Sequence, residues 1–277
     1  MIRFSVMTSF GWWDDGILGP RELLARLAAH GAGGVEVCAD DFLGDPALAR
    51  QHHAWLGETG LQLVAVDVLA NLVHRGARAR QAAVDALRRG LDVCVEQGAP
   101  VAHCVGSRLA DGVTPADGRK MIADLLAEQY DPYTSRHGVT LAIENYGLEP
   151  ELVCRRADCL EVLQRAGNRL RFVFDTGNFL AVGERAEDNL EACLEWIVMC
   201  HVKDWTAASR PPTSEAPAFF EASRLGEGVI DNPRVAAMLV ERGFNGWVSL
   251  ESCRHAGETV DQTLARELAL LRRWFAV

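Results

Sequence analysis

Four short, mostly apolar stretches of the sequence each end on a residue that can bind a metal ion. They read TLAIE, FVFD, IVMCH and WVSLE, and their last residues are Glu144, Asp175, His201 and Glu251. An apolar run that ends on a charged residue is typical of a buried parallel strand that brings one side chain to the edge of its sheet. The first two intervals between these residues each fit one strand–helix–strand repeat of roughly thirty residues. The sequence therefore predicts a metal site built from four consecutive strands.

The types of these side chains indicate which ion the site would take. Three carboxylates and one imidazole form an oxygen-rich donor set, which suits Mn²⁺, Mg²⁺ or Co²⁺ better than a metal that prefers thiolates. We expect one divalent cation, Mn²⁺ in the first place, with Mg²⁺ and Co²⁺ as alternatives. Acids at strand ends can also cap helices or pair with surface arginines, but four ligand-type residues in register favour the metal site.

Such a site would promote removal of a proton next to a carbonyl group. The metal would polarise the carbonyl of a bound substrate and stabilise the enediolate that forms when the α-proton leaves. Glu144 and Glu251 come from different strands, so one could remove a proton while the other returns it on the opposite face. We therefore expect these two glutamates to be catalytic as well as metal-binding.

The elements that must position these residues alternate regularly along the chain. Apolar runs and breaker residues predict strands at residues 2–8, 34–38, 61–68, 100–105, 140–146, 170–174, 198–202 and 246–251. Helical spacing of apolar residues predicts helices from Pro20 to Gly31, at residues 46–60, 77–98, 115–137, 151–166, 187–196 and 232–242, and at the C-terminus around Leu264, Leu268 and Leu271.

Eight strand–helix alternations with short connections predict an α/β protein with a single (β/α)8 TIM barrel. We expect one domain over residues 1–277, because no shift in composition marks a boundary and barrels of this length form one domain. An open doubly wound sheet is the alternative, but no GxGxxG motif follows the first strand. In a barrel, the carboxyl ends of all strands meet at one face, where side chains from the last four strands can surround one ion.

Composition indicates which kinds of partner the protein could bind and where in the cell it would be found. The net charge of −10 and pI near 5.3 disfavour a nucleic acid as partner, since affinity for phosphate comes mostly from Lys and Arg. The N-terminus lacks the pattern of a signal peptide, and no apolar run approaches the length of a membrane span. The eight cysteines are scattered without a CxxC pair, as in buried reduced thiols. We expect a cytoplasmic protein that binds neither nucleic acid nor membrane and could be a homo-oligomer.

Five motifs resemble those of the xylose-isomerase-like barrel superfamily, in particular its sugar phosphate isomerase/epimerase family. They are IEN at 143–145, FDTGN at 174–178, HVKD at 201–204, LGEGVID at 225–231 and SLES at 249–252. The resemblance covers the C-terminal half closely and the N-terminal half mainly in its strand–helix rhythm. It implies that Glu144, Asp175, His201 and Glu251 bind one divalent cation, and that the two glutamates serve as acid and base in an epimerase.

Other residues are candidates for contact with a small sugar or keto-polyol substrate. They are Asn145, Asn178, His103, Lys203, Trp12, Trp205 and Arg108. The two asparagines could instead orient a ligand, His103 could be a satisfied interior residue, and Lys203 could pair with Asp204 or Glu227. Glu227 itself is predicted to orient the ring of His201 without binding the metal ion. Many proteins of the family that the chain resembles carry a histidine at the position of Asn178, and an amide cannot carry a proton near neutral pH.

Three readings of function remain open at this stage. The first is a divalent-metal-dependent sugar isomerase or epimerase. The second is a metal-dependent dehydratase or lyase on the same barrel, similar to 3-dehydroshikimate or inosose dehydratases or to a keto-glycoside eliminase, and the replacement of histidine by Asn178 keeps it open. The third is a non-catalytic partner subunit, which the intact ligand set disfavours. Abasic-site endonucleases share the fold implied by the resemblance, but their sites carry more histidines and the acidic charge opposes DNA binding.

The segment at residues 206–224 is longer than a typical loop after a barrel strand. Pro211, Pro212 and Pro217 prevent a continuous helix, while Phe219 and Phe220 lie side by side near its end. The segment leaves from the expected catalytic face. It could cover the substrate, with Arg210 or Arg224 supplying a substrate contact, or it could be an oligomer contact.

Overall fold

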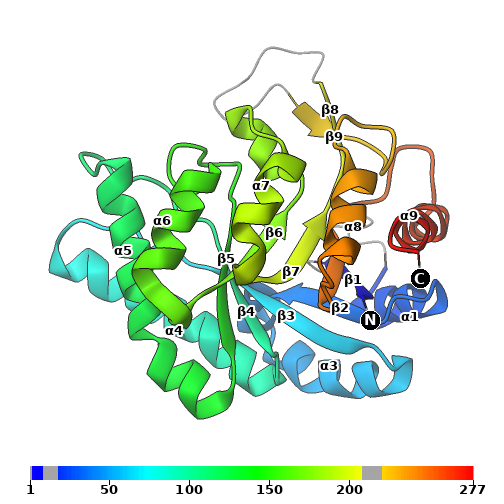
Figure 1. The fold of residues 1–277 in the computed structure, drawn as a ribbon. Coiled ribbons are helices and arrows are strands. Elements are labelled where there is room, and N and C mark those ends of the chain that lie inside the picture. The colour runs from blue at the N-terminus through cyan, green and yellow to red at the C-terminus, as the bar shows by residue number, and fades with distance from the viewer. Residues whose placement is uncertain (1, 9–17, 208–219, 277) are drawn as a thin grey trace.

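A closed barrel of parallel strands forms the centre of the computed structural model, and helices surround it (Figure 1). The structure describes residues 2–8, 18–207 and 220–276. The barrel strands are β1 (Arg3–Thr8), β2 (Gly34–Cys38), β3 (Gln62–Leu69), β4 (Val101–Val105), β5 (Thr140–Glu144), β6 (Arg171–Asp175), β7 (Ile197–Val202) and β10 (Trp247–Leu250). They pair in the order β1-β10-β7-β6-β5-β4-β3-β2, and β2 pairs again with β1. The predicted TIM barrel is confirmed.

The helices follow the strands in the expected alternation. They are α1 (Pro20–Ala29), α2 (Ala39–Gly44), α3 (Pro46–Thr59), α4 (Gly76–Gln97), α5 (Pro115–Glu128), α6 (Arg156–Ala166), α7 (Ala186–Cys193), α8 (Asn232–Glu241) and α9 (Val260–Trp274). Short helical turns lie at Tyr130–Ser135, Gly167–Arg169, Asn178–Val182 and Leu194–Trp196. None of the helices in the described part of the chain is long and apolar enough to cross a membrane.

Several boundaries differ from the sequence prediction. The helix predicted at 115–137 ends at Glu128 and continues as a π-turn over Tyr130–Ser135. Helix α6 begins at Arg156 and not at residue 151, and α2 was not predicted because its six residues lack a helical repeat of apolar positions. The short antiparallel pair β8 (Trp205–Ala207) and β9 (Phe220–Ala222) lies in the segment that was predicted to be irregular, of which residues 208–219 lie outside the described part.

Two separate apolar clusters hold the barrel together. The larger one packs the outer face of the strands against the helices. The smaller one fills the inside of the barrel and is called here the barrel floor: Val64, Ala65, Val101, Ala142, Val173 and Met199. Side chains two residues apart in a strand point to the same face. The residues two positions after Ala65, Val101, Ala142, Val173 and Met199 therefore point into the barrel, one layer nearer the carboxyl ends of the strands.

Candidate active site

Polar residues form the layer directly above the barrel floor. Each follows a floor residue by two positions: Asp67 after Ala65, His103 after Val101, Glu144 after Ala142, Asp175 after Val173 and His201 after Met199. Catalytic residues of TIM barrels lie at this end of the barrel, where the strands end. The strand alternation alone thus brings these side chains together.

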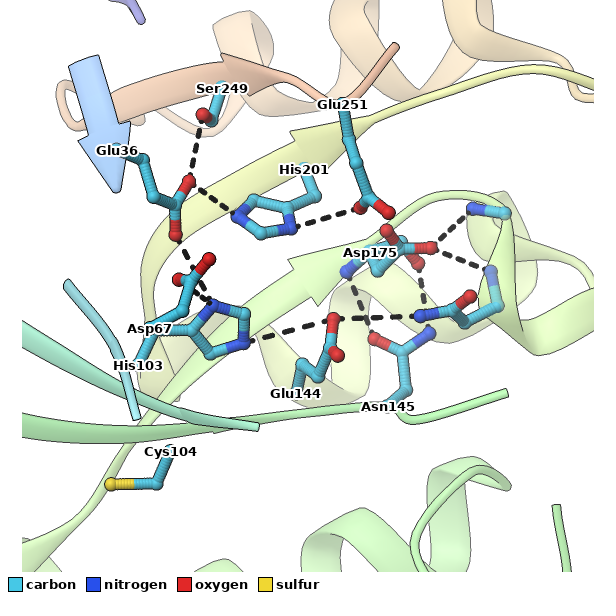
Figure 2. A network of polar contacts seen from close by, with 12 residues as sticks. Glu36, Asp67, His103, Cys104, Glu144, Asn145, Asp175, His201, Ser249 and Glu251 are labelled. Atoms are coloured by element: carbon cyan, nitrogen blue, oxygen red, sulfur yellow. Dashed lines mark hydrogen bonds and ion pairs between the residues drawn. The ribbon is translucent and has the colours of Figure 1, made fainter. Parts of the chain in front are cut away.

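The four residues predicted as metal ligands lie close together and are called here the rim cluster: Glu144, Asp175, His201 and Glu251 (Figure 2). Asp175 lies beside His201 in the register between β6 and β7. Glu144, Asp175 and His201 each offer one ligand atom within 4.8 Å of the others, and all three are buried. Glu251 follows the end of β10, and its Oε2 lies 3.2 Å from Nδ1 of His201. The predicted convergence of these four side chains is present in the structure.

Asp175 is held by the turn that follows β6. Its Oδ1 accepts hydrogen bonds from the backbone N–H groups of Gly177 at 2.8 Å and Asn178 at 2.6 Å. Its Oδ2 is buried and makes no hydrogen bond, although Nζ of Lys203 lies 3.1 Å away without the alignment that a hydrogen bond needs. A buried carboxylate oxygen without a hydrogen bond is costly, so this atom is suited to bind a cation.

The two predicted asparagine contacts have different roles. The amide of Asn145 donates to the backbone carbonyl of Asp175 and accepts from its backbone N–H, both at 2.9 Å. Asn145 is fully buried, and these two bonds hold the backbone of Asp175. Asn178 lines the cavity above the site, and its Nδ2 lies 3.5 Å from Oε2 of Glu144. It remains in a position to meet a substrate.

Lys203 pairs with partners other than the predicted Asp204 or Glu227. Its Nζ lies 2.7 Å from Oε1 of Glu251 and bridges toward Asp175. Burial would lower the pKa of the ammonium, but the carboxylates of Asp175 and Glu251 outweigh it and raise the pKa. Gly177 makes room for this side chain, because a Cβ there would lie 2.7 Å from Cγ of Lys203. A positive charge thus sits between two of the predicted ligands.

A second group of buried polar residues was missed as a unit by the sequence analysis and is called here the inner cluster: Glu36, Asp67 and His103. They come from the middle of β2, β3 and β4. Nδ1 of His103 lies 3.0 Å from Oδ1 of Asp67 and 3.2 Å from Oε1 of Glu36. The signal in the sequence was a lone acid between apolar residues in GVEVC and AVDV. Such an acid points to the same face as its second neighbour and here lies inside the barrel.

Burial and neighbouring charges shift the pKa values of the rim carboxyls in opposite directions. Burial raises the pKa of Asp175 to about 7, against the attraction of Lys203. Burial also raises the pKa of Glu144, although the nearby His103 opposes the shift. For Glu251 burial acts in the same direction, but the Lys203 ammonium and His201 outweigh it and hold the pKa well below its usual range. Burial therefore outweighs the nearby positive charges at Asp175 and Glu144, whereas the positive charges prevail at Glu251.

The inner cluster shows the same competition between burial and pairing. Burial alone would raise the pKa of Glu36, but His201 and His103 lower it well below its usual range. Burial and the nearby Glu36 raise the pKa of Asp67. Burial opposes the charge on His103, yet its two carboxylate partners raise its pKa to about 10. The pKa values of the two acids therefore shift in opposite directions, because histidine partners outweigh burial at Glu36 and burial prevails at Asp67.

A cavity of about 380 Å³ opens above the rim cluster. The predicted site residues that line it are His103, Glu144, Asn178, His201, Lys203, Trp205 and Glu251. Trp205 forms part of the wall, and its ring lies 6.0 Å from that of Phe220 across the β8–β9 pair. Trp12 lies outside the described residues. Tyr146, Leu148 and His255 also line the cavity, and the sequence analysis did not select them.

Two predicted site residues lie elsewhere. Arg108 is exposed and is not among the residues that line the cavity; its backbone N–H donates to Asn71. Glu227 does not orient His201, because its side chain is 60% exposed and faces Arg224 at 3.7 Å. Both ring nitrogens of His201 already face other carboxylates. Arg224, considered above for a substrate contact, pairs with Glu258 at 3.0 Å, and Arg210 lies outside the described residues.

Asp204 organises the loop in which Glu227 was expected to act. Its carboxylate accepts hydrogen bonds from the backbone N–H groups of Trp205, Gly226, Gly228 and Ile230. Gly228 is required here, since a Cβ at this position would lie 2.0 Å from Oδ1 of Asp204. The LGEGVID motif thus wraps around the acid of HVKD and fixes the chain on both sides of the β8–β9 pair.

Comparison with known structures agrees with this fold. A D-psicose 3-epimerase from Clostridium cellulolyticum H10, crystallised with D-tagatose, superimposes with a TM-score of 0.77 at 13% identity over 99% of each chain. The IOLI protein with a bound zinc atom gives 0.79 at 17% identity, covering 99% of this chain and 100% of the other. The probable 3-DHS dehydratase AsbF of Bacillus anthracis gives 0.74 at 12% identity, covering 97% and 98%. A search of curated protein sequences found no match.

One protein-family model matches nearly the whole chain. The family model described as xylose isomerase-like TIM barrel matches residues 24–274. This span contains the rim cluster, the inner cluster and each strand of the barrel except β1. The chain belongs to the xylose isomerase-like TIM barrel family.

Proposed function

We propose that this protein is a divalent-metal-dependent isomerase or epimerase that acts on a small sugar or keto-polyol. The observation that carries the proposal is the rim cluster: four ligand-type side chains from β5, β6, β7 and the end of β10, at the base of a cavity. The three structural relatives described above have names that include an epimerase, a zinc-binding protein and a probable dehydratase. The zinc atom of one relative supports a metal site on this barrel, and the names of the other two leave epimerisation and dehydration as candidate reactions.

The rim cluster fits a divalent cation. Ligand atoms of Glu144, Asp175 and His201 lie within 4.8 Å of one another, and Oδ2 of Asp175 lacks a hydrogen bond. Carboxylate and imidazole donors suit Mn²⁺, with Mg²⁺ and Co²⁺ as alternatives. When bound, the cation would supply Lewis acidity to a substrate carbonyl. Lys203, which pairs with Asp175 and Glu251 in the described structure, would then be free to turn toward a substrate oxygen.

The protein's own residues supply the proton transfers. Glu144 and Glu251 belong to strands separated in the barrel by β6 and β7, and both line the cavity from these separate positions. One would take the proton next to the carbonyl and the other would return it from the opposite side, which inverts or relocates the stereocentre. Asn178 holds Glu144 by its amide and orients it for this step.

Asn178 also keeps a lyase as the second candidate. An amide cannot carry a proton at neutral pH, so the described site lacks an acid at this position to complete reprotonation. After the same first step, Lys203 or His103 could instead protonate a leaving group on the neighbouring carbon, since both line the cavity. The product would then be an enone and not an isomer.

The deciding experiment is incubation with a panel of ketoses and keto-polyols in D₂O with Mn²⁺ present. Isomerisation or epimerisation incorporates deuterium at the α-carbon and gives isomeric products by NMR. Elimination gives a product that absorbs in the near ultraviolet. Metal analysis of the purified protein provides the control. Absence of bound divalent metal, of Mn²⁺-dependent turnover and of deuterium exchange would contradict the proposal and favour a non-catalytic partner subunit.

A further inference from the structure

Glu36 lies between the two histidines of the site. Its Oε2 is 2.9 Å from Nε2 of His201, and its Oε1 is 3.2 Å from Nδ1 of His103 (Figure 2). The hydroxyl of Ser249 also donates to Oε2 at 2.9 Å. Glu36, His103 and His201 are at most 1% exposed. One carboxylate in the middle of β2 therefore touches both imidazoles of the site.

This arrangement determines which nitrogen each histidine presents to the cavity. A carboxylate only accepts hydrogen bonds, so the ring nitrogen that faces Glu36 must carry a hydrogen. For His201 this is Nε2, which leaves Nδ1 on the side of Glu251. For His103 it is Nδ1, which leaves Nε2 buried, without a hydrogen bond and 3.8 Å from Oε2 of Glu144. The nitrogens turned away from Glu36 thus face Glu251 and Glu144, and both histidines line the cavity.

The alternative is that Glu36, His103 and His201 hold a second ion, because their ligand atoms also lie within 4.8 Å of one another. The two groups of possible ligands differ in how they are satisfied. The contacts of Glu36 are at hydrogen-bond distance, and the serine hydroxyl adds a donor. Oδ2 of Asp175 in the rim cluster has no hydrogen bond. Both oxygens of Glu36 are thus already occupied by side-chain hydrogen bonds, which disfavours an ion between it and the two histidines.

We propose that Glu36 is a positioning residue that fixes the ring orientation of both histidines, so that His201 offers Nδ1 to the metal ion and His103 offers Nε2 to the substrate. The identity of the groups that meet these nitrogens rests on the proposed function. The fixed orientation of the rings does not. Hydrogen bonds to the second nitrogen of a metal-binding histidine commonly set its tautomer and raise metal affinity roughly 10–100-fold.

Glu36→Gln is the decisive variant, with Asp67→Asn as its matched control. The glutamine has one oxygen and one NH₂ group, so it cannot accept from both histidines at once. Asp67 is similarly buried, and it contacts His103 but not His201. In metal-free protein labelled with ¹⁵N-histidine, the wild type should show slowly exchanging downfield N–H protons at Nε2 of His201 and Nδ1 of His103. Glu36→Gln should lose at least one of them, and Asp67→Asn should keep both.

Calorimetry with Mn²⁺ supplies the second readout. Glu36→Gln should bind Mn²⁺ about 10–100-fold more weakly than the wild type, while Asp67→Asn should stay within about threefold. If Glu36→Gln does not fold, Glu36→Asp keeps the buried charge but is too short to reach both rings, and the same loss of signals and affinity is expected.

The inference is overturned if Glu36→Gln keeps both protected N–H signals, or if both variants lose Mn²⁺ affinity equally. It is also overturned if the wild type binds two equivalents of Mn²⁺ and Glu36→Gln binds one. A wild type that binds no Mn²⁺ but shows the two protected signals would defeat the proposed function while leaving the role of Glu36 intact.

Discussion

The rim cluster and the inner cluster contain the same residue types but differ in their hydrogen bonding. Both combine buried carboxylates with an imidazole, and His201 touches both, through Nδ1 toward Glu251 and Nε2 toward Glu36. In the inner cluster, His103 bridges two acids at hydrogen-bond distance. In the rim cluster, Oδ2 of Asp175 lacks a hydrogen bond, and a lysine lies between two acids. The clusters differ in whether each carboxylate oxygen that points inward has a hydrogen bond, and not in the number of acids.

This difference suggests a rule for finding a ligand site among buried charges. A carboxylate that is fully paired can stabilise the charged form of its partner, as Glu36 and Asp67 do for His103. A buried carboxylate oxygen without a hydrogen bond, such as Oδ2 of Asp175, benefits from a cation. Substitution of Asp175 should therefore change metal binding, and the matched substitution of Asp67, which does not touch His201, should not.

The largest effect is expected for Glu251→Gln. This change keeps the shape of the side chain and removes its ability to carry a proton, so kcat on the best ketose of the panel should fall about a hundredfold or more. Glu227→Gln is the matched control, because that side chain is exposed and faces Arg224, and its kcat should be unchanged. A Glu251→Gln variant with nearly wild-type kcat would remove Glu251 from the catalytic role.

The next effect separates the two clusters directly. Asp175→Asn should weaken Mn²⁺ binding by at least tenfold in calorimetry, because it replaces a buried carboxylate oxygen without a hydrogen bond by an amide. Asp67→Asn, which alters an equally buried acid of the inner cluster, should leave the Kd for Mn²⁺ within about threefold. Equal losses in the two variants would show that the clusters act as one site and would break the comparison.

Thermal unfolding provides a smaller but simple test. At a hundredfold excess of Mn²⁺ over Kd, binding to the folded state should add about 2.7 kcal/mol. This corresponds to a rise in Tm of roughly 5–10 °C after the protein has been stripped with EDTA. The rise should persist in Asp67→Asn and disappear in Asp175→Asn. A Tm that ignores Mn²⁺ in the wild type would argue against a rim metal site.

His52 is a third buried histidine, and its pKa shifts in the opposite direction from those of His103 and His201. Burial lowers the pKa of His52 to about 4, although Nδ1 hydrogen-bonds the Gln97 amide at 3.0 Å. The unfolded chain takes up a proton near pH 6.5 and the folded chain resists it, so the free energy of unfolding should fall as the pH drops from about 6.5 toward 4. The loss amounts to about 2 kcal/mol.

Urea unfolding at pH 7.5 and pH 4.5 would measure this loss. His52→Gln should lose about 2 kcal/mol less stability than the wild type between these two pH values. The neighbouring His53→Gln, an exposed position on the same helix, serves as the control. Parallel losses in wild type and His52→Gln would show that His52 is not the neutral buried group that its surroundings indicate.

The barrel and the rim cluster could be predicted because both depend on local pattern. Parallel strands in this chain are short apolar runs, and residues such as Glu144 and Asp175 interrupt them only at the last position. The convergence of these ends then follows from the topology of the fold. The family resemblance rested on the same motifs, so it was strongest in the C-terminal half, which also carries the four predicted ligands.

The inner cluster was less accessible because its partners are set by packing across the barrel. Glu36 lies 165 positions before His201, and no spacing in the sequence relates the two. Lys203 was assigned to nearby acids for the same reason, while the barrel brings it to Glu251. The prediction for Glu227 was wrong because its loop is held by backbone bonds from Gly226 and Gly228 to Asp204, which no spacing in the sequence indicates.

The anchoring of the β8–β9 pair by Asp204 has a consequence for how this protein could diversify. Ala207 and Phe220 lie opposite each other in the register, so the described chain before residue 208 and after residue 219 is held at adjacent points. Doubling the length of a loop between fixed ends costs only about 0.6 kcal/mol in closure entropy. Segments of different length and sequence could therefore be exchanged here as a cassette while the barrel and its acids stay in place. Substrate range could change by such grafting without rebuilding the catalytic layer below.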